Sequence, residues 1–301
     1  MKINLPQNNI KTEVRKINLQ NITIGGDSAL SFMKENNNVS KPLFALEIPL
    51  NINQSFPSTL KAAFGDSINS FKSMFEFAQA SDCDLICIHF NIEESNLENN
   101  INIAILKTKE LIERSTKPII LKGVNSKEID KILLSRLAKE IKKPCIVAFA
   151  EENTYEAIVP SVIKNNHILV LRSPIDINLA KELNILSIDA GINPDRIIID
   201  PDMGALGYGL DYGYSIIEKI RQAAFDGDTM LNMPIITFIG EETFKVKEAK
   251  SDNFDPNYGK LGERAAMWEI ATASAILSAG ANILVLSHPQ SIKTLKEIVW
   301  N

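Results

Sequence analysis

The chain has 301 residues, of which 45% are hydrophobic and 23% are charged, and its formal net charge is −5. A chain of this length forms two ordinary domains or one large α/β barrel, and its composition excludes a disordered or fibrous protein. No long run of basic residues stands out, which argues against nucleic acid as the main partner.

The first 42 residues differ from the rest of the chain. They contain clusters of Asn separated by short apolar stretches. Residues 19–24 are typical of a short β element, and the pair Gly25-Gly26 directly after them is typical of a turn. We therefore expect residues 1–42 to form an N-terminal extension and residues 43–301 to form the main domain.

From residue 43 onward, short apolar runs alternate with segments of helical periodicity. Eight runs have the length of a buried strand, namely 43–50, 85–90, 118–123, 145–150, 168–173, 197–200, 234–240 and 283–288. Helical segments follow them at 66–80, 101–113, 128–141, 155–164, 177–186, 212–225, 262–279 and 292–299.

The alternation predicts an α/β fold with a parallel sheet. Continuous apolar runs indicate strands that are buried on both faces, and repeated strand–helix units are typical of parallel strands. Eight such units in about 260 residues match a (β/α)8 TIM barrel. An open doubly wound sheet is the alternative, but no G-x-G-x-x-G follows the first strand, so a dinucleotide-binding fold gains no support.

The three cysteines are Cys83, Cys87 and Cys145. They are too few to hold an iron–sulfur cluster within this chain, because such a cluster usually takes four ligands. An odd number of cysteines in a chain this long favours buried thiols in a reducing compartment over a disulfide framework. We therefore expect a cytoplasmic protein that carries no cluster of its own.

We expect no membrane segment. The opening residues are polar and lack the apolar core of a secretory leader. Residues 265–286 are mostly apolar, but Glu269 interrupts them and Gly280-Ala281-Asn282 follows as a break. A buried helix, a turn and a buried strand account for this stretch better than a membrane span does.

Polar side chains stand at the predicted carboxyl ends of the strands, where TIM barrels place their chemistry. They are Glu47, His89, Lys122, Arg172, Asp200, Asp202, Glu241 and His288. His89 and His288 form no H-x-H or H-E-x-x-H pair, so we expect no metal site and expect His288 to shape the turn into the last helix. Lys122 is placed as the Schiff-base lysine of an aldolase would be, which leaves a lyase open.

The most informative segment is residues 198–212, IIDPDMGALGYGLDY. Gly204, Gly207 and Gly209 fall within six positions, and such glycines let a backbone pass close to a ligand or another chain. No lysine follows them, which excludes a P-loop. The apolar residues around the glycines suit a large, flat, partly apolar partner better than a free phosphate.

This segment resembles the small subunit of the corrinoid iron–sulfur protein and its archaeal counterpart, the delta subunit of the acetyl-CoA decarbonylase/synthase complex. That family carries Asp-Pro followed by Leu-Gly-Tyr-Gly-Leu, as Asp200-Pro201 and residues 206–210 do here. Further similar stretches are IGGDSA (24–29), YSIIEKIR (214–221), WEIATA (268–273) and GANILVLSHP (280–289). Two positions depart from the family pattern: Met203-Gly204 stands where bacterial members tend to have Thr-Ala, and Asn282 replaces an Asp.

The resemblance implies a TIM barrel that pairs with a larger subunit, which carries the iron–sulfur cluster and the corrinoid-binding domain. The small barrel covers the corrinoid (cobalamin) while a methyl group passes from a methyl-tetrahydropterin, through a methyltransferase, to acetyl-CoA synthase in the reductive acetyl-CoA pathway. The residues expected at the shared corrinoid are Asp200, Asp202, Met203, Gly204, Ala205, Leu206, Gly207, Tyr208 and Gly209. No catalytic residue is assigned to the chain itself.

Two other functions stay open from the sequence. A catalytic methyltransferase barrel would bind the methyl-pterin itself, with Asp200 or Asp202 hydrogen-bonded to the pterin ring. The strand ends offer few Asn partners for such a ring, which favours the covering role. A lyase built on Lys122 leaves the glycine-rich segment without a role.

Overall fold

The computed structural model describes residues 10–30 and 39–300 of the chain. Its centre is a sheet of eight parallel strands. They are β3 (Leu43–Pro49), β4 (Leu85–His89), β5 (Ile119–Lys122), β6 (Ile146–Ala150), β7 (Ile168–Arg172), β8 (Ile197–Asp200), β9 (Ile236–Phe238) and β10 (Ile283–Leu286).

The sheet closes on itself. Its strands follow the order β8-β7-β6-β5-β4-β3-β10-β9, and a parallel bridge between Ile199 and Ile235 joins β8 to the start of β9. The N–H of Ile199 also donates to the carbonyl oxygen of Pro234 over 2.9 Å. The predicted (β/α)8 barrel is thereby confirmed, and the open doubly wound sheet is excluded.

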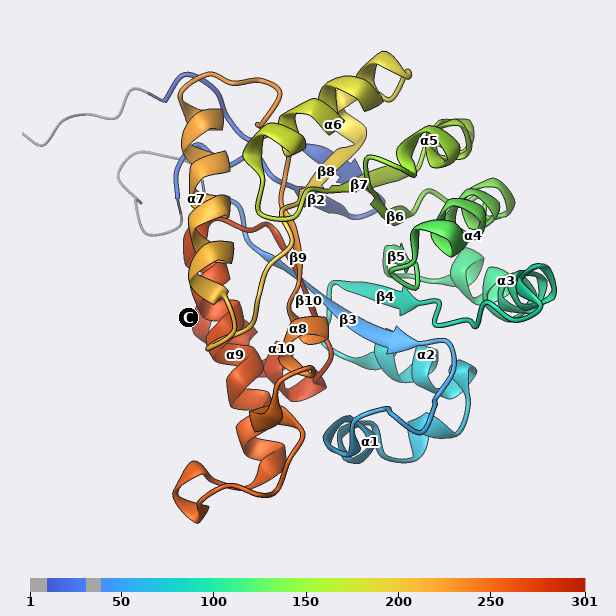
Figure 1. The fold of residues 1–301 in the computed structure, drawn as a ribbon, viewed down its shortest axis with the longest axis vertical. Coiled ribbons are helices and arrows are strands. Elements are labelled where there is room, and N and C mark those ends of the chain that lie inside the picture. The colour runs from blue at the N-terminus through green and yellow to red at the C-terminus, as the bar shows by residue number, and fades with distance from the viewer. Residues whose placement is uncertain (1–9, 31–38, 301) are drawn as a thin grey trace, which may run out of the picture.

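Helices surround the barrel, as Figure 1 shows. The α-helices are α1 (Ser58–Phe64), α2 (Phe71–Ala80), α3 (Leu97–Arg114), α4 (Lys127–Glu140), α5 (Tyr155–Lys164), α6 (Ile177–Asp189), α7 (Leu210–Phe225), α8 (Ile239–Thr243), α9 (Leu261–Ala279) and α10 (Pro289–Trp300). Short 3-10 helices are η1 (Gly65–Asn69), η2 (Pro194–Arg196), η3 (Lys247–Ala249) and η4 (Pro256–Tyr258). Within the two described ranges, no helix is long and apolar enough to cross a membrane.

Several predicted boundaries shift by a few residues in the structure, and two of these shifts change the elements themselves. The helix predicted over 66–80 begins only at Phe71, because Ser70 is extended and its hydroxyl accepts a backbone N–H of the first turn. An additional helix, α1, precedes it. The strand predicted over 234–240 ends at Phe238, and the apolar residues after it open α8.

A hairpin near the start of the chain closes the interior of the barrel. β1 (Ile17–Leu19) pairs antiparallel with β2 (Ile22–Ile24). The apolar cluster that fills the barrel contains Ile17, Leu19 and Ile24 of the hairpin together with Ala45, Leu85, Cys87, Ile120, Ile146, Ala148, Ile168, Val170, Ile198, Ile236, Phe238, Ile283 and Val285 of the strands.

Side-chain and backbone hydrogen bonds fasten this hairpin segment at the amino ends of the strands. The N–H of Arg15 donates to the carbonyl oxygen of Asn232 over 2.7 Å, shortly before β9 begins. Asn282 Nδ2 donates to Asp27 Oδ2 over 2.6 Å, and Asn282 Oδ1 accepts the N–H of Ile235 over 3.0 Å. The amide of Asn282 therefore joins three segments of the chain.

The turn of the hairpin lies at Gln20-Asn21 and not at the glycine pair. Gly25 and Gly26 follow β2 with φ values of +79° and +92°. A Cβ atom on Gly25 would lie 2.2 Å from the carbonyl oxygen of Arg15. A glycine is therefore required there by the close approach of two backbone segments.

We predict that Ile17→Ala lowers the free energy of unfolding by roughly 2–5 kcal/mol, because it leaves a cavity where the hairpin fills the barrel. Urea denaturation followed by circular dichroism measures the change. The matched control is Thr23→Ala in the same hairpin, whose side chain is exposed, and we expect a change within about 0.5 kcal/mol. Equal effects of the two substitutions would contradict the packing described here.

Candidate functional site

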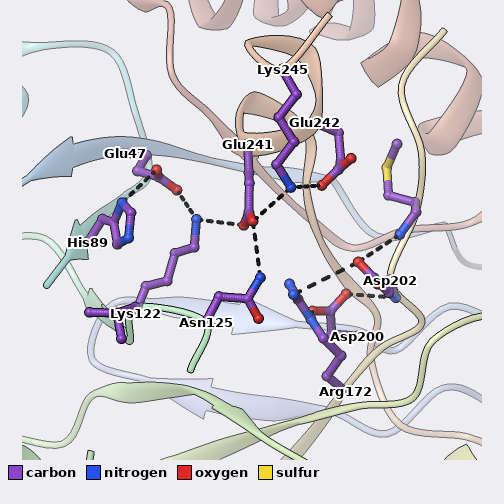
Figure 2. A network of polar contacts seen from close by, with 12 residues as sticks. Glu47, His89, Lys122, Asn125, Arg172, Asp200, Asp202, Glu241, Glu242 and Lys245 are labelled. Carbon is purple, nitrogen blue, oxygen red and sulfur yellow. Dashed lines mark hydrogen bonds and ion pairs between the residues drawn. The ribbon is translucent and has the colours of Figure 1, made fainter. Parts of the chain in front are cut away.

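The carboxyl ends of the strands bring most of the predicted polar residues together, as Figure 2 shows. The residues of this cluster are Glu47 of β3, His89 of β4, Lys122 of β5, Arg172 of β7, Asp200 of β8, Asp202 and Glu241. Their side chains form two networks of ion pairs, one centred on Lys122 and the other on Arg172.

Lys122 lies between two carboxylates. Its Nζ is 2.9 Å from Glu47 Oε2 and 2.9 Å from Glu241 Oε2, and its side chain is only 2% exposed. Burial lowers the pKa of this amine, but the two carboxylates raise it by more, so that the pKa lies above its ordinary value. Lys122 is therefore a cation at physiological pH.

Glu241 connects this cation to the surrounding loops. It lies in α8 rather than at the end of a strand, and its Oε1 accepts hydrogen bonds from Lys245 Nζ (3.1 Å) and Asn125 Nδ2 (3.4 Å). Burial raises the pKa of its carboxyl, but Lys122 and Arg172 lower it by more, so that the pKa falls well below its ordinary value. Glu241 is therefore ionised.

Arg172 is held by a carboxylate and an aromatic ring. Its Nε donates to Asp200 Oδ2 over 2.6 Å, and its Cζ lies 3.3 Å from the centroid of the Phe149 ring. Asp200 Oδ1 accepts the N–H of Asp202 over 3.0 Å. Burial raises the pKa of Asp200 to about 6, although Arg172 lowers it. Both oxygens of Asp200 are thus already engaged within the chain.

The two strand-end histidines make separate contacts. His89 Nδ1 lies 3.7 Å from Glu47 Oε1, and burial together with the charge of Lys122 lowers the pKa of His89 to about 4, so its imidazole is neutral at pH 7. His288 Nδ1 accepts the N–H of Gln290 over 3.2 Å, which fits its predicted role in the turn into α10. Among the described residues, no three His, Cys, Asp or Glu side chains are arranged to hold a metal ion.

The glycine-rich loop, residues 201–209, leads from β8 to α7 at this same end of the barrel. The side chains of Met203 and Ala205 are 4% and 1% exposed and belong to the core between the sheet and the helices. These two residues, which the sequence places among the corrinoid contacts, support the loop from beneath.

The loop is fastened to α9 through the backbone of Leu206. Its N–H donates to Thr272 Oγ1 over 3.2 Å, and its carbonyl oxygen accepts the indole N–H of Trp268 over 3.0 Å. Both partners belong to the WEIATA stretch of the helix. The two sequence stretches that resemble the family are thus in direct contact.

Close contacts and backbone angles within the chain explain why the loop carries glycines. A Cβ atom on Gly204 would lie 2.0 Å from the carbonyl oxygen of Tyr208, and Gly207 and Gly209 have φ values of +79° and +97°. A side chain at any of these positions would clash or be strained. The glycines therefore fix the shape of the loop.

The outer side of the loop presents aromatic side chains to solvent. Tyr208 is 53% exposed, and Tyr212 at the start of α7 is 63% exposed. The hydroxyl of Tyr208 donates to Glu248 Oε2 over 3.4 Å, which links the loop to the connection between α8 and α9. An exposed aromatic surface of this kind is typical of binding sites.

Sequence reasoning missed this second connection, residues 244–260, which projects at the bottom of Figure 1 in orange. The guanidinium of Arg264 holds it by donating to the carbonyl oxygens of Glu248 (2.8 Å), Gly259 (2.8 Å) and Ser251 (2.6 Å). The Asp, Asn, Pro and Gly residues of the segment are a signal for a long loop that could have found it.

Glu269 of α9 fixes the loop that follows β10. Its carboxyl oxygens accept the N–H groups of Ser287 (2.7 Å) and His288 (3.2 Å). The side chain is fully buried, and burial raises the pKa of this carboxyl to about 7 although the hydrogen bonds lower it.

We predict that Glu269→Gln becomes more stable relative to the wild type as pH rises from 5 to 8. The folded state binds the Glu269 proton more tightly than the unfolded state does, so the wild type loses stability between the ordinary pKa near 4.5 and about 7. The expected loss is at most about 3 kcal/mol. Urea denaturation of both proteins at pH 5 and pH 8 measures it.

The control for this pH dependence is Glu263→Gln, which removes an exposed carboxyl from the same helix. We expect its stability to follow that of the wild type across the same pH range. A Glu269→Gln protein whose stability stays parallel to the wild type would contradict the buried carboxyl described here.

In fold, the chain is similar to dihydropteroate synthases. The synthase of Coxiella burnetii, solved with pteroic acid, matches with a TM-score of 0.57 and 13% identity over 95% of this chain and 97% of that one. The synthase of Thermus thermophilus, solved with 4-aminobenzoate, matches with a TM-score of 0.57 and 9% identity over 95% and 99% of the two chains. At these identities the likeness concerns the fold alone.

In sequence, the chain is similar to archaeal delta subunits of the acetyl-CoA decarbonylase/synthase complex. Subunit delta 2 of Methanosarcina acetivorans is 30% identical over 295 residues, which cover 92% of this chain and 65% of that protein. The delta subunit of Methanopyrus kandleri is 24% identical over 280 residues, with 92% and 69% covered. This chain thus spans about two thirds of the length of such relatives.

The match to a family model extends over nearly the whole chain. Residues 15–295 match the model described as CO dehydrogenase/acetyl-CoA synthase delta subunit. The matched region includes the closing hairpin, all eight barrel strands and the glycine-rich loop. The resemblance predicted from the sequence is confirmed, and the chain belongs to the CO dehydrogenase/acetyl-CoA synthase delta subunit family.

Proposed function

We propose that this chain is the small subunit of a corrinoid iron–sulfur protein and covers a corrinoid held mainly by a larger partner. The larger partner carries the iron–sulfur cluster, and the two subunits form a heterodimer in the cytoplasm. The pair accepts a methyl group from a methyl-tetrahydropterin through a methyltransferase and delivers it to acetyl-CoA synthase in the reductive acetyl-CoA pathway. Family membership supports the place of the chain in such a complex.

The observation that carries the proposal is the exposed outer side of the glycine-rich loop at the carboxyl end of the barrel. Tyr208 is half exposed. The residues on either side of it, Gly207 and Gly209, have positive φ angles. Arg264 and Glu248 brace the neighbouring connection against this loop. The result is a supported, partly apolar surface that suits a large flat ligand.

The chain is proposed to assist rather than to catalyse. Lys122 is neutralised by Glu47 and Glu241, and Arg172 by Asp200, so these charged groups already have partners. The corrinoid would supply the cobalt that carries the methyl group. The contribution of this chain is to exclude water and oxidants from that reactive centre.

The chemistry of the thiols supports an iron–sulfur cluster held by the partner and not by this chain. Cys83, Cys87 and Cys145 are free and buried. Burial raises the pKa of the Cys87 and Cys145 thiols, which opposes the thiolate form that iron requires. Three buried cysteines are also fewer than the four ligands that a cluster usually takes.

We predict that the isolated chain binds cobalamin weakly and that the heterodimer binds it tightly, because the site is shared. Equilibrium dialysis of cobalamin against each form measures the two affinities. Tyr208→Ala should weaken cobalamin binding by the heterodimer roughly tenfold, as loss of an aromatic contact does. Leu106→Ala on α3, which removes an exposed apolar side chain elsewhere, should leave binding unchanged. Equally tight binding by the chain alone would refute a shared site.

A catalytic pterin-binding methyltransferase is the second candidate, and the carboxylates of Asp200 and Asp202 at a strand end favour it. The dihydropteroate synthase solved with pteroic acid has the same fold. Arg172 and a backbone N–H hold both oxygens of Asp200, and the Asp200 side chain is only 1% exposed, so a pterin ring would have to displace these partners to reach it.

We therefore predict that the purified chain does not transfer a methyl group from methyl-tetrahydropterin to free cob(I)alamin. The appearance of methylcobalamin in the visible absorption spectrum measures the transfer. Turnover that is abolished by Asp200→Asn would establish the methyltransferase instead. A lyase built on Lys122 is disfavoured, because a protonated amine cannot attack a carbonyl.

A further inference from the structure

Ile175 adopts a backbone conformation that β-branched residues rarely take. Its φ is +50°, in the left-handed region, where a branched side chain crowds its own backbone. The other non-glycine residues with positive φ in the described part of the chain are Gln20, Asn96, Asn125, Asn166 and Asp202. Asn and Asp tolerate that region best, so Ile175 is the β-branched exception.

Hydrogen bonds of the short connection between β7 and α6 impose this conformation. The N–H of Ile175 donates to the carbonyl oxygen of Pro201 over 2.9 Å, and the N–H of Ser173 donates to the carbonyl oxygen of Asp200 over 2.9 Å. The side chain of Asp176 then caps the first turn of α6. The connection is therefore fixed at both ends.

Packing within the chain covers only about half of Ile175. It is 48% exposed. A single exposed isoleucine is ordinary, but a half-exposed isoleucine under backbone strain costs stability with only a partial gain from packing. This combination indicates a contact made outside the chain.

Ile175 adjoins the loop proposed to cover the corrinoid. Pro201, which accepts its hydrogen bond, is the first residue of that loop, and Asp202 is the second. Asp202 Oδ1 accepts the N–H of Met203 over 3.2 Å and lies 3.9 Å from Arg172 Nη1. Asp202 Oδ2 makes no hydrogen bond to any described residue, and the side chain is 36% exposed.

We propose that Ile175 and Asp202 contact the edge of the corrin ring, an inference that rests on the proposed function. The edge of a corrin carries methyl groups and primary amides. Ile175 packs against the methyl groups, and Asp202 Oδ2 accepts a hydrogen bond from an amide N–H. The connections that carry Ile175 and Asp202 are joined by a backbone hydrogen bond, and Asp202 Oδ2 accepts no hydrogen bond from a described residue. An apolar side chain and an available carboxylate oxygen on these two connections suit the methyl and amide groups of that edge.

The test is Ile175→Asn, because Asn suits the left-handed region but lacks the branched apolar side chain. We expect a higher urea midpoint for the isolated chain than for the wild type. We also expect roughly tenfold weaker binding to the cobalamin-loaded larger subunit, measured by isothermal titration calorimetry. Misfolding cannot produce both results, since stability rises while affinity falls.

Two further variants sharpen the test. Gln20→Asn makes the same kind of change at φ +52° in the hairpin at the other end of the barrel, and we expect unchanged affinity for the loaded partner. Asp202→Asn replaces one acceptor oxygen by a donor, and we expect roughly tenfold weaker binding to the loaded partner. The larger subunit without cobalamin is titrated in parallel with each variant.

The outcomes separate the inference from the function on which it rests. If the wild-type chain binds the loaded and the cobalamin-free partner equally, the proposed function fails. If the wild type prefers the loaded partner but Ile175→Asn binds it as tightly, the inference is wrong and the proposed function stands. An equal loss of affinity for both forms of the partner places Ile175 against the polypeptide and also overturns the inference.

Discussion

A closed barrel of eight strands has an interior that its own side chains must fill. This chain fills the amino end with apolar side chains and closes it with a hairpin that carries Ile17 and Ile24. It fills the carboxyl end with charges of both signs, among them Lys122 and Arg172. Buried charges are tolerated only when they are paired. The ion-pair networks around these two cations are therefore required for the fold to be stable.

Because the barrel is filled in this way, we expect the loops, and not the centre of the barrel, to contact a ligand. The strand-end charges contact one another, so a ligand at the centre would have to compete with these ion pairs. The loops that follow β8 and α8 stand above them, braced by Arg264 and by the backbone of Leu206. A rigid scaffold that carries such loops can present a broad surface, as the proposed covering of a flat cofactor requires.

The sequence predicted the eight strands correctly because buried parallel strands are continuous apolar runs. It also predicted α5 at Tyr155–Lys164, although Pro160 lies inside that helix. It did not predict the contact of Lys122 with Glu241, since the two residues are far apart in the chain. Glu241 also belongs to a short helix, α8, whose first residues lie in the apolar run that was predicted to be a strand. Nor did it separate the buried Met203 from the exposed Tyr208, because both are compatible with a loop surface.

The motif by which the chain resembles its family is largely a folding device. Gly204 avoids the carbonyl oxygen of Tyr208, and Gly207 and Gly209 supply left-handed turns, so each glycine is explained without a ligand. The glycine spacing therefore predicts the shape of the loop and not what it binds. Recognition has to come from the side chains that this shape presents. The exposed ring of Tyr208 and the half-exposed side chain of Ile175, whose backbone is strained, are two groups whose exposure the fold itself does not require.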